Sequence, residues 1–219
     1  MKKLIIFDLD GTLIDTIRDL GTAVNHALEL RGYPLHAISE YPAFVGNGIR
    51  NLVKSALPAE HRDDATVDAA LEDFRAYYME HLDVYSRPYA GMPELVEWLS
   101  GAGFTVAVAS NKFQEGTGFL IRRFFPSIPE PLIWGNRPGQ PFKPDPAVIF
   151  GVMQAAGLAR AEDAVLVGDS ANDMNSAARA GVDCISVTWG FRSREALSAV
   201  GAKTLVDTVE ELKEKILSA

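Results

Sequence analysis

The chain has 219 residues, of which 47% are hydrophobic, and its formal net charge at pH 7 is −8. This length allows either one large domain or a core with a smaller inserted domain, and the composition is that of an ordinary globular protein. Because a net negative field repels phosphate backbones and anionic lipid, we expect neither a nucleic acid nor a membrane surface as a partner.

Cys184 is the single cysteine of the sequence. It cannot form a disulfide within the chain, and no thiolate cluster is available for a structural zinc site. The apolar run from Leu4 to Phe7 is too short for the core of a signal peptide, and no stretch approaches the ~20 apolar residues of a membrane span. We therefore expect a soluble protein in the reducing cytoplasm.

The first predicted element is a strand from Leu4 to Phe7. Its residues are all apolar, which is typical of a strand covered on both faces inside a parallel sheet. Asp8 and Asp10 follow directly, and residues i and i+2 of a strand point to the same side. Both carboxylates therefore face one site at the carboxyl end of the strand, where open α/β sheets bind ligands. A hairpin turn at Asp10-Gly11 is the alternative, but the sequence that follows is helical.

The section from residue 15 to residue 87 contains helical periods with no convincing buried strand between them. Its apolar residues recur at the spacing of helices that pack through one face. The predicted helices lie near residues 16–32, 49–57 and 67–82. We therefore predict a helical domain at residues 15–87, inserted into a core that is formed by residues 1–14 and 88–219.

The rest of the chain alternates between helical patterns and short apolar runs. One helix is predicted at residues 146–156, with Asp145 as its N-cap and Pro146 in the first helical position. Another is predicted at residues 172–180, and Gly181 is placed to end it. Buried strands are predicted at residues 106–109, 165–167 and 185–187, with weaker candidates at 132–134 and 204–206. Such alternation predicts an α/β fold with a Rossmann-like parallel-sheet core.

Asp169 and Asp173 form a second pair of acids, after the run at residues 165–167. Asp169 lies at a strand end, as Asp8 and Asp10 do, whereas Asp173 lies where a helix begins and is equally compatible with a capping role. Carboxylates that meet at one sheet edge repel one another by about 4 kcal/mol per pair at ~4 Å and an effective dielectric near 20, so they need cations or protons. An all-oxygen site with few acids suits Mg²⁺, whereas Ca²⁺ favours more ligands.

Lys143 stands before Pro144, just ahead of a predicted helix. The net charge of the chain repels an anionic substrate, so a site for one must carry local positive charge. A phosphate dianion beside several acids also needs more positive charge than one divalent ion provides, and Lys143 is the candidate. Ser110-Asn111-Lys112 follow another predicted strand, where a hydroxyl and a backbone N–H are suited to phosphate oxygens. Taken alone, each of these sequences is also typical of a solvated loop.

Taken together and in this order, the four sequences resemble the motifs of the haloacid dehalogenase superfamily, along the whole chain. Residues 8–12 are similar to its first motif, Ser110 to the second, Lys143 to the third and residues 168–173 to the fourth. The resemblance implies a magnesium-dependent phosphatase that forms an aspartyl-phosphate. The dehalogenases of this superfamily lack the second acid of the first motif, so the presence of Asp10 favours phosphoryl transfer.

The resemblance implies a role for each of these residues. Asp8 is the nucleophile and Asp10 is the general acid and base, while Ser110 and Lys143 bind the phosphoryl group. The physical chemistry agrees, because a carboxylate attacks phosphorus only when both negative charges are offset by a metal and a lysine. Asp10 would give a proton to the leaving alcohol and later remove one from water.

The same resemblance implies the ligands of the Mg²⁺ ion. They are Asp8, the backbone carbonyl of Asp10, and Asp169. Asp173 is expected either to bind the ion or to lie directly behind its ligands.

Within the superfamily, the helical insert resembles the cap of the phosphoglycolate phosphatase group. The shorter matches are residues 45–48 in the insert and residues 188–191 near the end of the core. They imply a small phosphorylated substrate, with phosphoglycolate as the first choice. The residues expected to contact it are Thr12, Ser110, Asn111, Lys143, Gly46, Asn47 and Gly48. Gly46 and Gly48 fit a tight turn between helices equally well, and Arg50 faces either a substrate carboxylate or solvent.

Other activities of the same fold stay open, namely inorganic pyrophosphatase, nucleotidase, sugar-phosphate phosphatase and phosphoglucomutase. A mutase needs a cationic cap to hold a bisphosphate, and no cluster of Lys and Arg in the insert is dedicated to that. A non-catalytic binding module is the alternative from a different class. It has no physical need for the like charges of Asp8, Asp10 and Asp169 beside Lys143. The oligomeric state, monomer or homodimer, also stays open.

Overall fold

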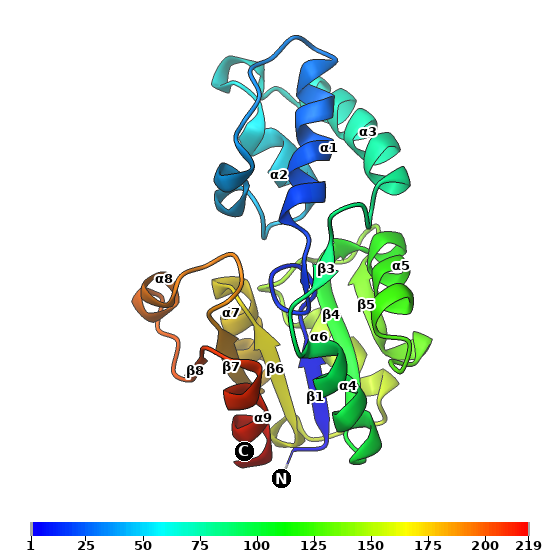
Figure 1. The fold of residues 1–219 in the computed structure, drawn as a ribbon, viewed down its shortest axis with the longest axis vertical. Coiled ribbons are helices and arrows are strands. Elements are labelled where there is room, and N and C mark those ends of the chain that lie inside the picture. Colours follow the sequence, from blue (N-terminus) through cyan, green and yellow to red (C-terminus); the bar gives the residue numbers. More distant parts are fainter. Residues whose placement is uncertain (1, 219) are drawn as a thin grey trace. The chain divides into compact units, whose positions relative to one another are not determined.

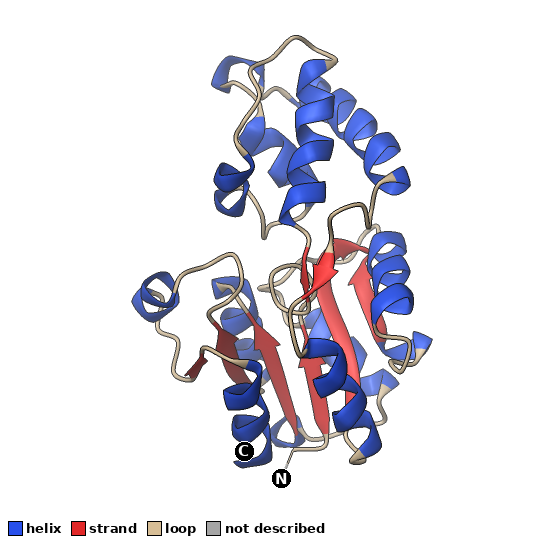
Figure 2. Cartoon of the chain, in the orientation of Figure 1, coloured by secondary structure: helices blue, strands red, loops and turns tan. Residues whose placement is uncertain are grey.

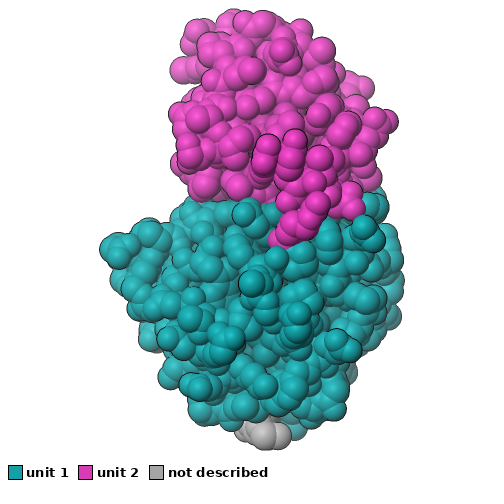
Figure 3. Space-filling model, viewed as in Figure 1, with its two compact units in different colours: residues 1–15, 88–219 teal, residues 16–87 magenta. Residues whose placement is uncertain are grey.

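The computed structural model describes residues 2–218. The chain forms two compact units, which are coloured separately in Figure 3. Unit 1 comprises residues 1–15 and 88–219, and unit 2 comprises residues 16–87. Across the described range, no helix is both long enough and apolar enough to cross a membrane.

A parallel six-stranded sheet forms the centre of unit 1, in the order β5-β4-β1-β6-β7-β8 (Figure 1). The strands are β1 Leu4–Phe7, β4 Thr105–Phe113, β5 Ile133–Asn136, β6 Ala164–Gly168, β7 Asp183–Val187 and β8 Leu205–Val206. β1 lies between β4 and β6, and its four side chains are fully buried. That burial explains its continuous apolar run, because both faces of the strand are covered. The predicted α/β fold with a parallel-sheet core is confirmed.

Helices cover both faces of this sheet (Figure 2). α4 packs with α9 on one face, and α6 packs with α7 on the other. The helices of unit 1 are α4 Met92–Gly101, α5 Gln114–Phe124, α6 Ala147–Ala155, α7 Ala171–Ala180, α8 Arg194–Ala199 and α9 Val209–Ser218, with 3-10 turns at Glu130–Leu132 and Ala161–Asp163. Covered on both faces, the sheet exposes functional side chains only at its strand ends.

The strand predicted at residues 106–109 is longer in the structure. β4 continues to Phe113, and its pairing with β5 shifts register between Ala109 and Phe113. Ser110-Asn111-Lys112 therefore lie inside a strand and not after one. The polar sequence hid the extension, because the apolar run that predicts a buried strand stops at Ala109. Ser110 and Lys112 are polar, although both are buried in the structure.

The two helices predicted in this unit differ little from those observed. α6 begins at Ala147, and Pro146 precedes it as the N-cap residue instead of occupying the first helical position. The carboxylate of Asp145 still caps the helix, since it accepts a hydrogen bond of 2.9 Å from the N–H of Ala147. α7 ends as predicted at Gly181, whose φ of 71° is a left-handed conformation that favours glycine.

Unit 2 is built from helices among the residues that the structure describes. They are α1 Ile17–Glu29, α2 Ile49–Ala56 and α3 Asp64–Glu80, with 3-10 turns at Ile38–Ala43 and Ala59–His61. α3 packs against both α1 and α2. The chain enters and leaves this unit through two short paired strands, β2 Ile14–Asp15 and β3 Arg87–Pro88, which the sequence did not predict.

Candidate active site

Two neighbouring strands of the sheet bring the predicted acids together. Asp8 follows β1 and Asp169 follows β6, and these parallel strands pair with Phe7 opposite Val167. The N–H of Asp8 continues that ladder, because it donates to the carbonyl of Val167 at 2.9 Å. Asp8, Asp169 and Asp173 each offer a carboxylate oxygen within 4.8 Å of the others, and all three residues are buried. We refer to these three residues as the acid cluster.

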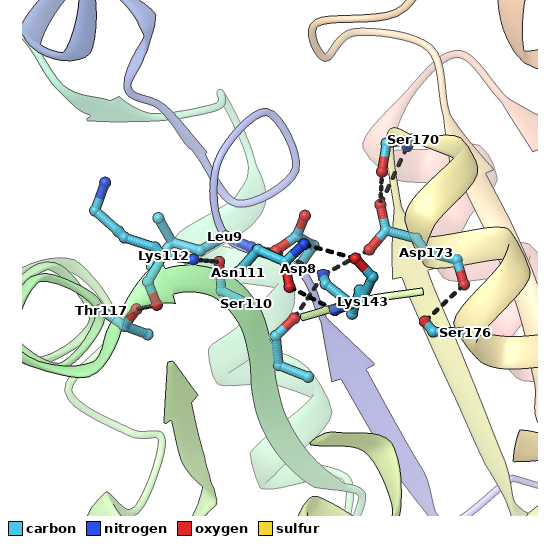
Figure 4. Close-up of polar contacts among 11 residues, drawn as sticks. Asp8, Leu9, Ser110, Asn111, Lys112, Thr117, Lys143, Ser170, Asp173 and Ser176 are labelled. Carbon is cyan, nitrogen blue, oxygen red and sulfur yellow. Dashed lines mark hydrogen bonds and ion pairs between the residues drawn. The ribbon is translucent and has the colours of Figure 1, made fainter. Parts of the chain in front are cut away.

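Lys143 provides the positive charge inside the acid cluster. Its ammonium nitrogen lies 2.9 Å from Oδ1 of Asp8 and 2.6 Å from Oδ1 of Asp173 (Figure 4). It also donates to the carbonyl of Ala109 at 2.8 Å. An ammonium group has three N–H donors, and these three acceptors use all of them. The lysine side chain is 1% exposed, so its charge is fixed within the site.

The acid cluster is short of positive charge. Burial raises the pKa of Asp8 to about 6, although Lys143 opposes the shift. Burial, together with Asp173 and Asp8, raises the pKa of Asp169 to about 8. For Lys143, burial lowers the pKa, but Asp173 and Asp8 more than offset this and raise it above its ordinary value. A cation bound by these carboxylates would restore their usual acidity.

Asp173 has a fully buried carboxylate that is occupied on both oxygens. Oδ1 binds Lys143, and Oδ2 accepts hydrogen bonds from the N–H and the hydroxyl of Ser170 at 3.1 and 2.6 Å. The carbonyl oxygen of Asp173 also accepts from the hydroxyl of Ser176 at 3.0 Å. The capping role that the sequence left open is observed, whereas a role at the metal stays a prediction. Asp173 caps α7 and also holds the lysine of the site.

Asp10 has a buried cation of its own. The ammonium nitrogen of Lys112 lies 3.1 Å from Oδ1 of Asp10, and the lysine side chain is 1% exposed. The sequence around Lys112 is also typical of a loop and indicates no charge partner for this lysine. The spacing does indicate that Lys112 faces the site. It lies two residues after Ser110, and such residues share one side of a strand. The backbone N–H of Lys112 in turn donates to the hydroxyl of Ser110 at 3.2 Å.

Asn111 supports the site through its backbone partners. Its side-chain nitrogen donates to the carbonyl of Lys143 at 3.0 Å, and its oxygen accepts from the N–H of the same residue at 2.7 Å. This pair of hydrogen bonds holds the Lys143 segment against β4. In the structure the carboxamide of Asn111 supports the lysine. Its expected contact with the substrate stays a prediction.

The side chain of Thr12, which is also expected to contact the substrate, is fully buried. Among the described residues, its hydroxyl is the one buried side-chain polar atom without a hydrogen-bond partner. Its carbonyl accepts a hydrogen bond of 3.2 Å from the indole nitrogen of Trp189. Thr12 therefore has a structural contact with the segment that follows β7.

The candidate residues of the insert lie in unit 2. Gly46 and Gly48 have φ values of 129° and 79°, conformations that residues with side chains rarely adopt. These values support the turn that the sequence left as an alternative. Arg50 binds Asp64 at 2.8 Å and Asp68 at 3.0 Å within the same unit, so two carboxylates of the protein occupy its guanidinium.

Comparison with known proteins agrees with this geometry. The family model described as haloacid dehalogenase-like hydrolase matches residues 5–187. The phosphoglycolate phosphatase of Pseudomonas savastanoi pv. phaseolicola is 35% identical over 97% of this chain and 79% of its own length. Phosphoglycolate phosphatase 1 of Pseudomonas aeruginosa is 33% identical over the same shares. A solved structure from Lactobacillus delbrueckii subsp. bulgaricus has a TM-score of 0.91 and 32% identity, covering 99% of both chains. The predicted resemblance is confirmed, and the chain belongs to the haloacid dehalogenase-like hydrolase family.

Proposed function

We propose that this protein is a magnesium-dependent phosphatase that hydrolyses a small phosphate monoester through an aspartyl-phosphate on Asp8, with phosphoglycolate as the first candidate substrate. One observation carries the reaction class, namely a buried carboxylate paired at 2.9 Å with a buried lysine inside a cluster of further acids. The relatives called phosphoglycolate phosphatase, at 33% to 36% identity, support the choice of substrate. We also propose that the protein is located in the cytoplasm.

The hydrogen bonds of Asp8 favour one of its oxygens as the nucleophile. Oδ1 accepts from the N–H of Leu9 at 2.7 Å and pairs with Lys143 at 2.9 Å. The described residues give Oδ2 no such partner, so Oδ2 is the oxygen placed to attack phosphorus. The lysine offsets the charge of the carboxylate, which otherwise repels a phosphate dianion.

Asp10 is the proton carrier in this proposal. It gives a proton to the oxygen of the leaving alcohol as the ester bond breaks. It then takes a proton from the water that attacks the aspartyl-phosphate, which releases phosphate and restores Asp8. Ser110, 3% exposed and at the same edge of the sheet, is the candidate to hold a phosphoryl oxygen.

The donor set of the site fits a hard divalent cation. Four carboxylates, those of Asp8, Asp10, Asp169 and Asp173, face two buried lysines, which leaves two negative charges to neutralise when all are ionised. We assign Mg²⁺ to Asp8, Asp169 and the backbone carbonyl of Asp10, with Asp173 behind Lys143. When bound, the ion offsets the charge of the phosphate and of the attacking carboxylate.

We also propose that unit 2 is a helical cap that selects the substrate. The family motifs of unit 1 recognise the phosphoryl group, which every candidate substrate shares. Selection among esters therefore needs other residues, and Asn47 between two positive-φ glycines is the first candidate.

Phosphate release from a panel of compounds tests the proposal. The panel contains phosphoglycolate, pyrophosphate, a sugar phosphate and a nucleoside monophosphate, each assayed with Mg²⁺, with Ca²⁺ and with a chelator. We expect turnover of a small monoester with Mg²⁺, little with Ca²⁺ and none with the chelator. Preference for pyrophosphate would change the substrate but not the mechanism. Full activity in the metal-free protein would refute the mechanism.

A further inference from the structure

The segment Thr188–Phe191 follows β7 and has no role in the chemistry described above. We call it the 188–191 segment. It contacts both Asp169 and the turn that contains Asp10, and all of these residues belong to unit 1. Three contacts connect the segment to these residues, one each from Trp189, Gly190 and Phe191.

The first contact fixes the carboxylate of Asp169. The backbone N–H of Phe191 donates to Oδ2 of Asp169 at 2.7 Å. It is the one hydrogen bond that the described residues give to this side chain, which is 3% exposed. The N–H therefore sets the orientation of the carboxylate and leaves Oδ1 as the oxygen for a cation.

The second contact is a close approach of backbone to backbone. A Cβ atom on Gly190 would lie 2.2 Å from the carbonyl oxygen of Gly11 and 2.5 Å from Oδ2 of Asp169. Gly11, whose φ is 83°, would likewise place a Cβ only 2.4 Å from that same oxygen. Asp169 thus lies between two glycines, and neither position has room for a side chain.

The third contact ties the segment to the first motif. The indole nitrogen of Trp189 donates to the carbonyl of Thr12 at 3.2 Å. The Trp189 ring also lies against Tyr89, with ring centroids 6.4 Å apart. Thr12 directly follows Gly11, so this hydrogen bond and the glycine contact hold two consecutive residues of the turn that contains Asp10.

We propose that the 188–191 segment is a positioning element for the metal site, which sets Asp169 and the turn of residues 8–12 at a fixed spacing. The inference rests on the proposed function, since it takes Asp169 and the carbonyl of Asp10 as ligands of Mg²⁺. Groups that orient ligands change metal affinity by about 10- to 100-fold when they are altered. The expected signature is therefore weaker metal binding, with a smaller effect on turnover once metal is saturating.

Gly190→Ala is the principal test. Its matched control is Gly101→Ala, because Gly101 lies in α4 and an added Cβ there meets nothing within 4 Å. Binding is measured without substrate, as Mn²⁺ affinity by electron paramagnetic resonance and Mg²⁺ affinity by competition. We expect Gly190→Ala to weaken both by about 10-fold or more and Gly101→Ala to match the wild type. Wild-type affinity in Gly190→Ala overturns the inference.

Trp189→Phe provides a second test that keeps an aromatic ring in place. It removes only the indole donor to Thr12, so we expect Mg²⁺ affinity to fall by about 2- to 10-fold. Turnover at saturating Mg²⁺ should fall by less. An unchanged affinity, or an equal loss of turnover at every Mg²⁺ concentration, overturns the positioning role.

These measurements separate the two proposals. A wild-type protein that binds no Mg²⁺ and hydrolyses no ester refutes the proposed function, and the inference fails with it. A wild-type protein that binds and hydrolyses, together with variants that bind equally well, refutes the inference alone.

Discussion

The two units of this protein differ in how many charged residues they bury and in the groups that those residues contact. Of the charged residues that are buried between residues 2 and 218, six lie in unit 1, namely Lys2, Asp8, Lys112, Lys143, Asp169 and Asp173, and one, Asp19, lies in unit 2. Asp19 accepts hydrogen bonds from the N–H of Tyr85, and from the N–H and hydroxyl of Ser86. Neutral donors satisfy that carboxylate completely. In unit 1 the acids instead face lysines and one another, and two of them have raised pKa values.

This difference indicates where ligand binding has been built into the fold. A carboxylate held by backbone N–H groups needs nothing more, whereas acids that repel one another are stabilised when a cation arrives. Charge in unit 2 is otherwise mostly exposed, as in the ion pairs of Arg50, and exposed ion pairs contribute little to stability. Unit 1 therefore carries an electrostatic cost that the proposed Mg²⁺ ion would offset.

The two units also differ in their histidine content. All four, His26, His36, His61 and His81, lie in unit 2. Histidine is the most frequent general base in enzymes, and the unit that contains the acid cluster has none. Without a histidine in unit 1, carboxyl groups are the next candidates for proton transfer, which supports the proposed role of Asp10.

The largest effect is expected for Asp8→Asn. The amide is nearly isosteric, but it is a poor nucleophile, so we expect kcat to fall by at least about a thousandfold. The melting temperature, followed by circular dichroism, checks that the fold is kept. Activity within tenfold of the wild type would remove Asp8 as the nucleophile and weaken the contrast between the units.

Magnesium binding should release protons from unit 1. With a pKa of about 8, Asp169 is largely protonated at pH 7 in the metal-free protein. Its raised pKa contributes stability that is present below about pH 4 and is lost as the pH rises through about 8. Mg²⁺ binds the ionised form, so about one proton should be released at pH 7 and almost none at pH 9.

Calorimetry in two buffers with different heats of ionisation measures that proton release. Mg²⁺ should also raise the melting temperature more at pH 8.5 than at pH 6, because it replaces the stabilisation that deprotonation removes. A binding heat that is independent of the buffer at pH 7 would show that the acids are already ionised. The excess of negative charge in unit 1 would then have no energetic consequence.

Lys112→Met should have a smaller effect than the loss of the nucleophile. It removes the cation beside Asp10, and we expect kcat to fall by roughly 10- to 100-fold, within the range of general acid and base catalysis. Lys2→Met is the control, since Lys2 is also a buried lysine, paired with Asp183 at 2.6 Å. Steady-state phosphate release should give that control a kcat close to the wild type. Equal losses in both variants would show that any buried lysine matters equally.

Much of unit 1 could be predicted from its sequence because the signals are local. The runs that became β1 and β6 are apolar over consecutive residues, and Asp8 and Asp169 lie where those runs stop. Parallel strands align their carboxyl ends, so the meeting of these acids followed from the pattern alone. The order of the four motifs along the chain then indicated the family.

The remaining features depend on residues that are far apart in the sequence. Lys112 binds an acid 102 residues away, and Asn111 binds the backbone of Lys143, 32 residues away. Neither partnership changes the local pattern of hydrophobicity or turns. The strands β2 and β3 have two residues each and are separated by the whole of unit 2, so they have no periodicity to detect.

The smallest effect is expected in unit 2, for Asn47→Ala. Asn47 lies between glycines with φ values of 129° and 79°, so its backbone is held in a turn that the substitution preserves. If unit 2 selects the substrate, the ratio of kcat/KM for phosphoglycolate to that for pyrophosphate should change by about 3- to 10-fold, as expected when one polar contact is lost. Mg²⁺ affinity should not change, because the acid cluster lies in unit 1. Arg50→Ala is the control, since Asp64 and Asp68 already occupy this arginine, and it should leave the ratio unaltered. A loss of kcat/KM by one common factor for both substrates would make residues 46–48 a structural turn and place substrate selection in another part of the chain.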